Sequence, residues 1–208
     1  ISSIDTILSD INITTGYQTI IELDEPCNMN LTPDFYFSGT NYFNSSINHN
    51  TQSSNWNSNQ EYKADFNLSD FNENVTSVDV LIQNIEDIHG NPLLNPNGIN
   101  ICSIDTKNPS PSLVLLSDTL INIEDLNTNP QIGAIVSFDE AMDTSIIPEF
   151  MLYNGTEIHS SIIMNSFGTF WTDSSTLNTE LWVFGDTNNL IHLELICLGA
   201  KDINGNTI

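Results

Sequence analysis

The sequence predicts an all-β protein that consists of two copies of one β-sandwich in tandem, and two observations carry this prediction. The first is an internal repeat at a constant shift of 115 residues, which aligns Ser77–Leu93 with His192–Ile208 and Glu22–Asn28 with Ser137–Asp143. The second is the pattern between the turns, where short β-rich runs alternate and no stretch keeps a helical period.

One register without a gap relates residues 22–91 to 137–206, and it also aligns Trp56 with Trp171. Upstream of this region the shift falls to 108, so the first copy has a shorter loop before its second strand. A chain of 208 residues accommodates two domains of about 100 residues each. We therefore expect a first domain at 1–105 and a second at 106–208.

The individual strands are predicted from alternation and from the turn residues that separate them. Val78–Gln83 and Leu193–Leu198 alternate with the period of a sheet that has one more buried face. Asn, Gly, Asp and Pro clusters bound the other runs. These runs are Thr19–Leu23, Tyr62–Leu68, Gly98–Ile104, Ile132–Phe138 and Leu181–Phe184. Six or seven such strands per copy are typical of a sandwich, with Trp56 and Trp171 as core aromatics between the sheets.

Three motifs in the second copy, taken in order, resemble a known family. They are "SIDTKNPSPSLVLLSD", "SFDEAMDTSIIPEF" and "AKDINGN", and together they are similar to the Ig-like tandem repeats of bacterial and archaeal surface proteins, including S-layer-associated proteins and biofilm adhesins. The resemblance implies a seven-stranded Ig-like sandwich repeated head to tail into a stalk or fibre, with calcium stiffening the junctions. The first copy departs from the pattern, because "LDEPCN" lacks the acid that Asp143 supplies.

The charge balance excludes several partners. The chain has 27 acidic residues against three lysines, for a net charge of -24. Nucleic acid and anionic membrane surfaces are therefore poor partners. No run of 18 apolar residues occurs, so no membrane insertion is predicted in this segment. Six N-x-S/T sequons suit an extracellular or cell-surface protein and are weak evidence alone; they are at Asn12, Asn30, Asn44, Asn67, Asn74 and Asn154.

The cofactor that the sequence leaves open is calcium, since an acidic surface suits divalent cations. The turns "EDIHGN" and "KDINGN" have two interpretations: a structural turn in which Asp87 or Asp202 bonds its own backbone, or a cation site that uses Asp202 with Asn206. The candidate calcium ligands are Asp105, Asp118, Asp125, Glu140, Asp143 and Asp202. Zinc is not favoured, because Cys27, Cys102 and Cys197 form no closely spaced pair, and we expect them to be buried free thiols.

No catalytic motif emerges, and we predict that the chain is not an enzyme. The favoured function is a structural subunit of an extracellular filament, stalk or cell-surface array. Its partners would be further copies, associated head to tail, or neighbouring Ig-like domains. The alternatives are a ligand-binding adhesin module for a glycan or protein, with Tyr42, Phe43 and Phe167 as exposed candidates, and an accessory domain of a larger secreted protein.

The two ends of the chain raise a further question. After "EDIHGN" the first copy continues into the strand Gly98–Ile104, whereas the sequence ends two residues after "KDINGN", so the second copy lacks its last strand by this comparison. Ile1–Thr6 ("ISSIDT") resembles Ile101–Thr106 ("ICSIDT"). Residues 1–6 either complete a neighbouring subunit by strand donation or begin the first strand of domain 1, in which case the missing strand lies beyond the sequence shown.

Overall fold

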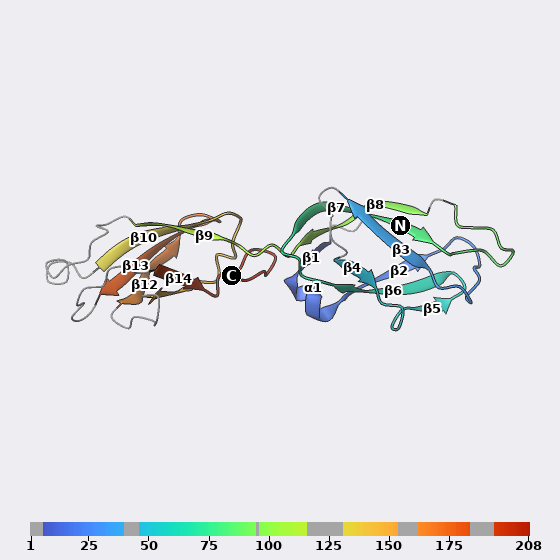
Figure 1. Ribbon diagram of the computed structural model, residues 1–208, viewed down its shortest axis with the longest axis horizontal. Coiled ribbons are helices and arrows are strands. Elements are labelled where there is room, and N and C mark those ends of the chain that lie inside the picture. Colours follow the sequence, from blue (N-terminus) through green and yellow to red (C-terminus); the bar gives the residue numbers. More distant parts are fainter. Residues whose placement is uncertain (1–5, 40–45, 95, 116–130, 154–161, 184–193) are drawn as a thin grey trace. The chain divides into compact units, whose positions relative to one another are not determined.

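The computed structural model describes residues 6–39, 46–94, 96–115, 131–153, 162–183 and 194–208. The chain divides into two compact units, residues 1–107 (unit 1) and residues 108–208 (unit 2), which are labelled by element in Figure 1. Strands dominate both units, so the predicted all-β fold class is confirmed. Among the described residues no helix is long and apolar enough to cross a membrane.

Unit 1 consists of two sheets and one short helix. One sheet has the strand order β1-β8-β7-β3. The other has the order β2-β6-β4, and β5 also pairs with β6 in this sheet. The strands are β1 (Ile7–Ser9), β2 (Tyr17–Glu22), β3 (Asp34–Gly39), β4 (Ile47–His49), β5 (Asn55–Ser58), β6 (Glu61–Leu68), β7 (Asn74–Gln83) and β8 (Asn97–Asp105). The two sheets form a β-sandwich, in which the first strand, β1, pairs with the last strand, β8.

The core of unit 1 forms because alternate residues of facing strands are apolar. On β6 the side chains of Tyr62, Ala64, Phe66 and Leu68 are buried, and the residues between them point outward. β7 and β8 supply the opposite face of the same hydrophobic cluster. Two sheets with one apolar face each must pack against each other to remove those faces from water.

The N-terminal segment pairs within unit 1 where it is described. β1 runs parallel to β8, with Ile7 opposite Ser103, and the Ser103 amide donates to the Thr6 carbonyl at 3.0 Å. Residues 1–5, which belong to the hypothesised donor segment, lie outside the described residues. Thr6 itself therefore belongs to the sandwich of its own unit.

The helix α1 (Asp10–Thr15) follows β1 directly, and the sequence pattern did not predict it. Six residues are fewer than two helical turns, which is too short to display a period. The Asn12 side chain accepts from the Ser9 amide at 3.0 Å and so caps the start of the helix. Gly16, with φ of 71°, ends it in a backbone conformation that few other residues adopt.

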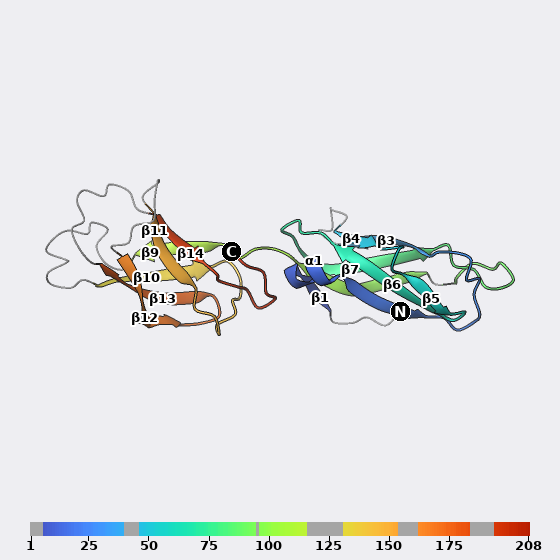
Figure 2. The same cartoon turned by 90° about the horizontal axis from the view of Figure 1, so that it is seen from below.

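Unit 2 repeats this architecture with fewer described strands. Its sheets have the orders β12-β13-β10-β9 and β11-β14. The strands are β9 (Pro111–Leu115), β10 (Gln131–Phe138), β11 (Glu149–Tyr153), β12 (Ile162–Trp171), β13 (Thr176–Val183) and β14 (Glu194–Leu198). Side chains from both sheets, among them Val136, Phe150 and Cys197, form one buried cluster. Figure 2 shows the strands of each unit from a second direction.

The two units share side-chain hydrogen bonds as well as the pairing of their central strands. The Trp56 indole donates to the Leu31 carbonyl at 2.8 Å, and the Trp171 indole donates to the Ile146 carbonyl at 2.9 Å. Each bond joins a strand of one sheet to the loop that leads into the other sheet. The structure thus gives both tryptophans the sheet-bridging position expected from the repeat.

The "EDIHGN" and "KDINGN" segments form the same turn. One carboxylate oxygen of Asp87 accepts from the amides of His89 and Asn91, and the other accepts from the Asn91 side chain. Asp202 makes the equivalent three bonds in unit 2. Gly90 and Gly205 have φ of 86° and 92°, as the structural interpretation of these turns requires.

The units differ at their sheet edges. β9 pairs with β10, whereas β1 pairs with β8 and so belongs to the other sheet of its unit. β7 lies between β3 and β8, but its counterpart β14 pairs only with β11 among the described residues of unit 2. Cys27, Cys102 and Cys197 are buried free thiols, as predicted.

The indole bonds yield a test of the internal repeat. We expect Trp171→Phe to lower the free energy of unfolding of unit 2 by about 1–3 kcal/mol, because it leaves the Ile146 carbonyl without its donor. Trp56→Phe should have a similar effect on unit 1. Urea unfolding followed by circular dichroism measures both, with Tyr36→Phe, at an exposed aromatic, as the control. An unchanged midpoint in both tryptophan variants would contradict the proposed sheet-bridging role.

Candidate functional site

The acidic loops at one end of unit 2 bring three of the predicted calcium ligands onto neighbouring segments. Met142 forms a β-bridge with Asp202, and the Asp143 amide donates to the Lys201 carbonyl at 2.9 Å. The Ile203 amide donates to the Ala141 carbonyl at 3.1 Å. The loop that carries Glu140 and Asp143 therefore lies directly on the turn of Asp202.

Asp143 has a definite role within its loop. Its Oδ1 accepts from the backbone amide of Ser145 at 3.0 Å and from the Ser145 hydroxyl at 2.6 Å. These hydrogen bonds, and then the positive charge of Lys201, lower the pKa of the Asp143 carboxyl. In unit 1 the equivalent residue Asn28 accepts from the Asn30 amide at 3.1 Å, so the turn itself needs no charge.

The other predicted ligands are placed differently. Asp202 is 1% exposed, and both its carboxylate oxygens accept hydrogen bonds from its own turn. Asp105 is 7% exposed and is the last residue of β8 in unit 1, opposite Ser9 and Asn74. Asp118 and Asp125 lie outside the described residues. A calcium site thus stays a prediction, for which unit 2 offers Glu140, Asp143 and Asp202.

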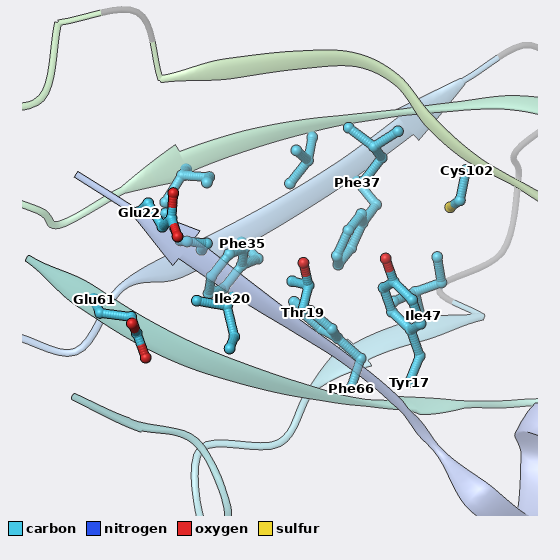
Figure 3. Close-up of a pocket in the computed structure, with 14 residues that line it drawn as sticks. Tyr17, Thr19, Ile20, Glu22, Phe35, Phe37, Ile47, Glu61, Phe66 and Cys102 are labelled. Atoms are coloured by element: carbon cyan, nitrogen blue, oxygen red, sulfur yellow. The ribbon is translucent and has the colours of Figure 1, made fainter. Parts of the chain in front are cut away.

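Unit 1 contains a cavity of about 520 Å³ between its two sheets (Figure 3). Its walls are mostly aromatic and aliphatic, with Tyr17, Phe35, Phe37 and Phe66 among them. Glu22 and Glu61 also line it. The cavity lies beside β2, the edge strand of its sheet in the described part of unit 1.

Two ionisable groups of this cavity, Cys102 and Tyr17, are poorly suited to nucleophilic chemistry near neutral pH. Burial raises the pKa of the Cys102 thiol to about 12, so the reactive thiolate is rare. Burial also raises the pKa of the Tyr17 phenol. The cavity is therefore a region of apolar surface between the sheets.

The outer face of β12 and β13 in unit 2 carries a distinct arrangement that begins with a bulge. Asn165 pairs with Glu180 and Phe170 pairs with Asn178, so four residues of β12 loop out between them. The Asn165 side chain holds this bulge, because its Oδ1 accepts from the Phe167 amide at 3.1 Å. The Thr169 hydroxyl closes it by donating to the Asn165 carbonyl at 2.9 Å.

A carboxylate lies beside the bulge. Glu180 Oε1 accepts from the Asn165 side chain at 2.7 Å and from the Trp182 indole at 2.9 Å. A Cβ atom at Gly168 would lie 2.6 Å from Glu180 Oε2, so the absent side chain makes room for the carboxylate. Gly133 pairs with Glu180 from β10 and adds no side chain there. Two donors and two glycines thus fix the carboxylate in place.

Three aromatic side chains of β12 and β13 are open to solvent, and the indole of one of them, Trp182, contacts this carboxylate. Phe167 is 99% exposed, Phe170 is 51% exposed and Trp182 is 40% exposed. Phe167 is one of the exposed candidates that the sequence singled out, and its exposure excludes packing against Trp171. Tyr42 and Phe43, the other predicted adhesin residues, lie outside the described residues.

No protein-family model matches the chain, and no curated protein matches it significantly.

The hydrogen bonds of Asp143 yield a prediction about pH. Because its folded pKa is lowered, ionised Asp143 stabilises unit 2 above the pKa of the unfolded carboxyl, and this contribution is lost as the pH falls through the lowered folded value. We expect Ser145→Ala to raise the pKa of Asp143, as measured by NMR titration of its carboxyl carbon. Lys201→Gln should raise it less, and Ser174→Ala should leave it unchanged. If Lys201→Gln raised the pKa of Asp143 more than Ser145→Ala did, the charge of Lys201 and not the hydrogen bonds of Ser145 would be the larger cause of the lowered pKa.

Proposed function

We propose that this chain is part of an extracellular structural array, a filament, stalk or cell-surface layer built from tandem Ig-like domains, and that it is not an enzyme. The observation that carries the proposal is the repetition itself. Two consecutive units share the pairing of their central strands, the tryptophan bond and the aspartate turn at one constant shift. Repeats of this kind add length by adding units, which is what a stalk or fibre requires.

The edge of β14 supports assembly by strand donation. In unit 1 the equivalent strand β7 has β8 along this edge, and β14 has no such partner among the described residues. An unpaired strand edge is a ready template for a further strand. Thr6 pairs within its own unit, but Ile1–Asp5, the rest of the predicted donor segment 1–6, has nearly the sequence of Ile101–Asp105, the end of the strand that completes unit 1. A second copy could therefore supply the strand, and repetition of that contact would produce a head-to-tail fibre.

The surface chemistry suits an extracellular location. Asn30, Asn67 and Asn74 are exposed sequon residues, which glycosylation would require. A net charge of -24 opposes close association of two copies unless cations are present. Calcium held by Glu140, Asp143 and Asp202 would supply such charge at the end of unit 2.

The alternative function is an adhesin module or an accessory domain of a larger secreted protein. One observation favours the adhesin: an almost fully exposed phenylalanine on a hydrogen-bonded bulge. A structural array does not need this feature, and adhesion and array formation are compatible in one surface protein.

Negative-stain electron microscopy of the purified chain tests the array. We expect head-to-tail fibres, and we expect a molar excess of a peptide with the sequence of residues 97–106 to shorten them by occupying the β14 edge. A scrambled peptide of the same composition is the control. Single particles at every concentration, or fibres indifferent to the peptide, would contradict assembly by strand donation.

Calcium is tested separately by thermal unfolding. We expect calcium to raise the melting temperature of unit 2 relative to EDTA, because a ligand that binds only the folded state stabilises it. The double variant Glu140→Gln/Asp143→Asn should remove the difference, and its second substitution reproduces the residue of unit 1. Identical curves for the unmodified protein in calcium and in EDTA would eliminate the cation site.

A further inference from the structure

The outer face of β12 and β13, which carries the bulge of unit 2, can be compared with the equivalent face of unit 1, because unit 1 forms the same bulge. The Gln52 amide donates to Asn50 Oδ1 at 3.2 Å, and the Ser54 hydroxyl donates to the Asn50 carbonyl at 2.8 Å. The pairing of Asn55 with Lys63 corresponds to that of Phe170 with Asn178. The bulge is therefore a feature of the repeated fold.

The residues that the bulge presents are not repeated. At the shift of 115, Phe167, Phe170 and Trp182 correspond to Gln52, Asn55 and Asn67. Unit 1 thus folds with polar side chains at all three positions. The fold does not require the three aromatic side chains of unit 2, and solvent-exposed aromatic groups gathered on one face indicate a binding surface.

The carboxylate also differs between the units. In unit 1 Asp65 accepts from Gln18 at 2.7 Å and forms a 3.0 Å ion pair with Lys63. In unit 2 Gly133 replaces Gln18 and Asn178 replaces Lys63. Glu180 therefore has no basic residue at these two positions, and the Asn165 side chain and the Trp182 indole both donate to its Oε1.

We propose that the face formed by Phe167, Phe170, Glu180 and Trp182 binds a neutral glycan. Aromatic rings present flat apolar surfaces to the C–H faces of sugar rings, and a fixed carboxylate accepts hydrogen bonds from their hydroxyl groups. This inference deepens the adhesin alternative and does not depend on the array.

The spacing of the aromatics selects an extended ligand. With a rise of about 3.4 Å per residue, Asn178, the partner of Phe170, lies roughly 14 Å along β13 from Trp182. Backbone positions this far apart favour an extended ligand over a single ammonium group, which aromatic rings bind within about 6 Å. They do suit a chain of several sugar rings, with Glu180 midway between them.

Two rival ligands fit less well. An extended peptide that adds to the β12 edge needs a regular row of backbone donors and acceptors, and the bulge interrupts that row. An anionic glycan would be repelled by Glu180 and by the net charge of the chain.

Affinity electrophoresis in native gels tests the proposal, because neutral polysaccharides slow only the proteins that bind them. The gels contain dextran, yeast mannan or hydroxyethylcellulose. We expect at least one to retard the protein, and the triple variant Phe167→Gln/Phe170→Asn/Trp182→Asn to bind at least tenfold more weakly. This variant installs the residues of unit 1. Glu180→Gln should weaken binding, and Tyr36→Asn, at an exposed aromatic of unit 1, should not.

The single variant Phe167→Gln keeps the test independent of folding, since this side chain is 99% exposed, and it should also weaken binding. Retardation by none of the three polysaccharides, or equal retardation of the triple variant, would overturn the proposal. So would binding to poly-lysine alone, which would indicate a basic partner. A dimer in sedimentation velocity that the triple variant abolishes would instead assign the face to a second copy.

Discussion

The hydrogen bond from an indole to a carbonyl across the sandwich is the interaction on which each unit depends. A sheet with one apolar face has many ways to cover that face, because apolar contact is not directional. The bonds of Trp56 to Leu31 and of Trp171 to Ile146 select one alignment of the two sheets, since an indole N–H must find an acceptor when it is partly buried. The remaining shared features, the aspartate turn and the bulge, are held by hydrogen bonds within their own segments.

The fold could be predicted from the sequence to the extent that it repeats. Two copies at one constant shift defined strands such as β6 and β10 within one or two residues, and the turns at Gly90 and Gly205 followed from residue type. The helix α1 was missed because six residues show no period. The different pairing of β1 and β9 was missed because a first strand shows the same alternating sequence pattern whichever of the two sheets it joins.

The candidate site residues were harder to predict, and the reason is physical. Phe167 stands out because an aromatic residue lies among polar ones, but Phe170 and Trp182 read as ordinary strand residues. Which face of a strand they occupy depends on the register across the bulge, and that register follows from the hydrogen bonds of the Asn165 side chain. The acidic residues were difficult to assign because they are so numerous. In a chain this acidic, the sequence cannot distinguish a calcium-binding residue from a turn residue such as Asp202.

In the bulge, the residues that determine the backbone shape differ from the residues that are exposed to solvent. The shape of the bulge is determined by one asparagine and one hydroxyl residue, which both units retain, while the tip residue Phe167 is almost fully exposed and unit 1 carries polar side chains at the equivalent positions. The fold therefore tolerates different residues at these positions, and one copy of a duplicated unit can acquire a binding surface that the other copy lacks. A surface built from such units could present different chemical groups at regular intervals along a single uniform scaffold.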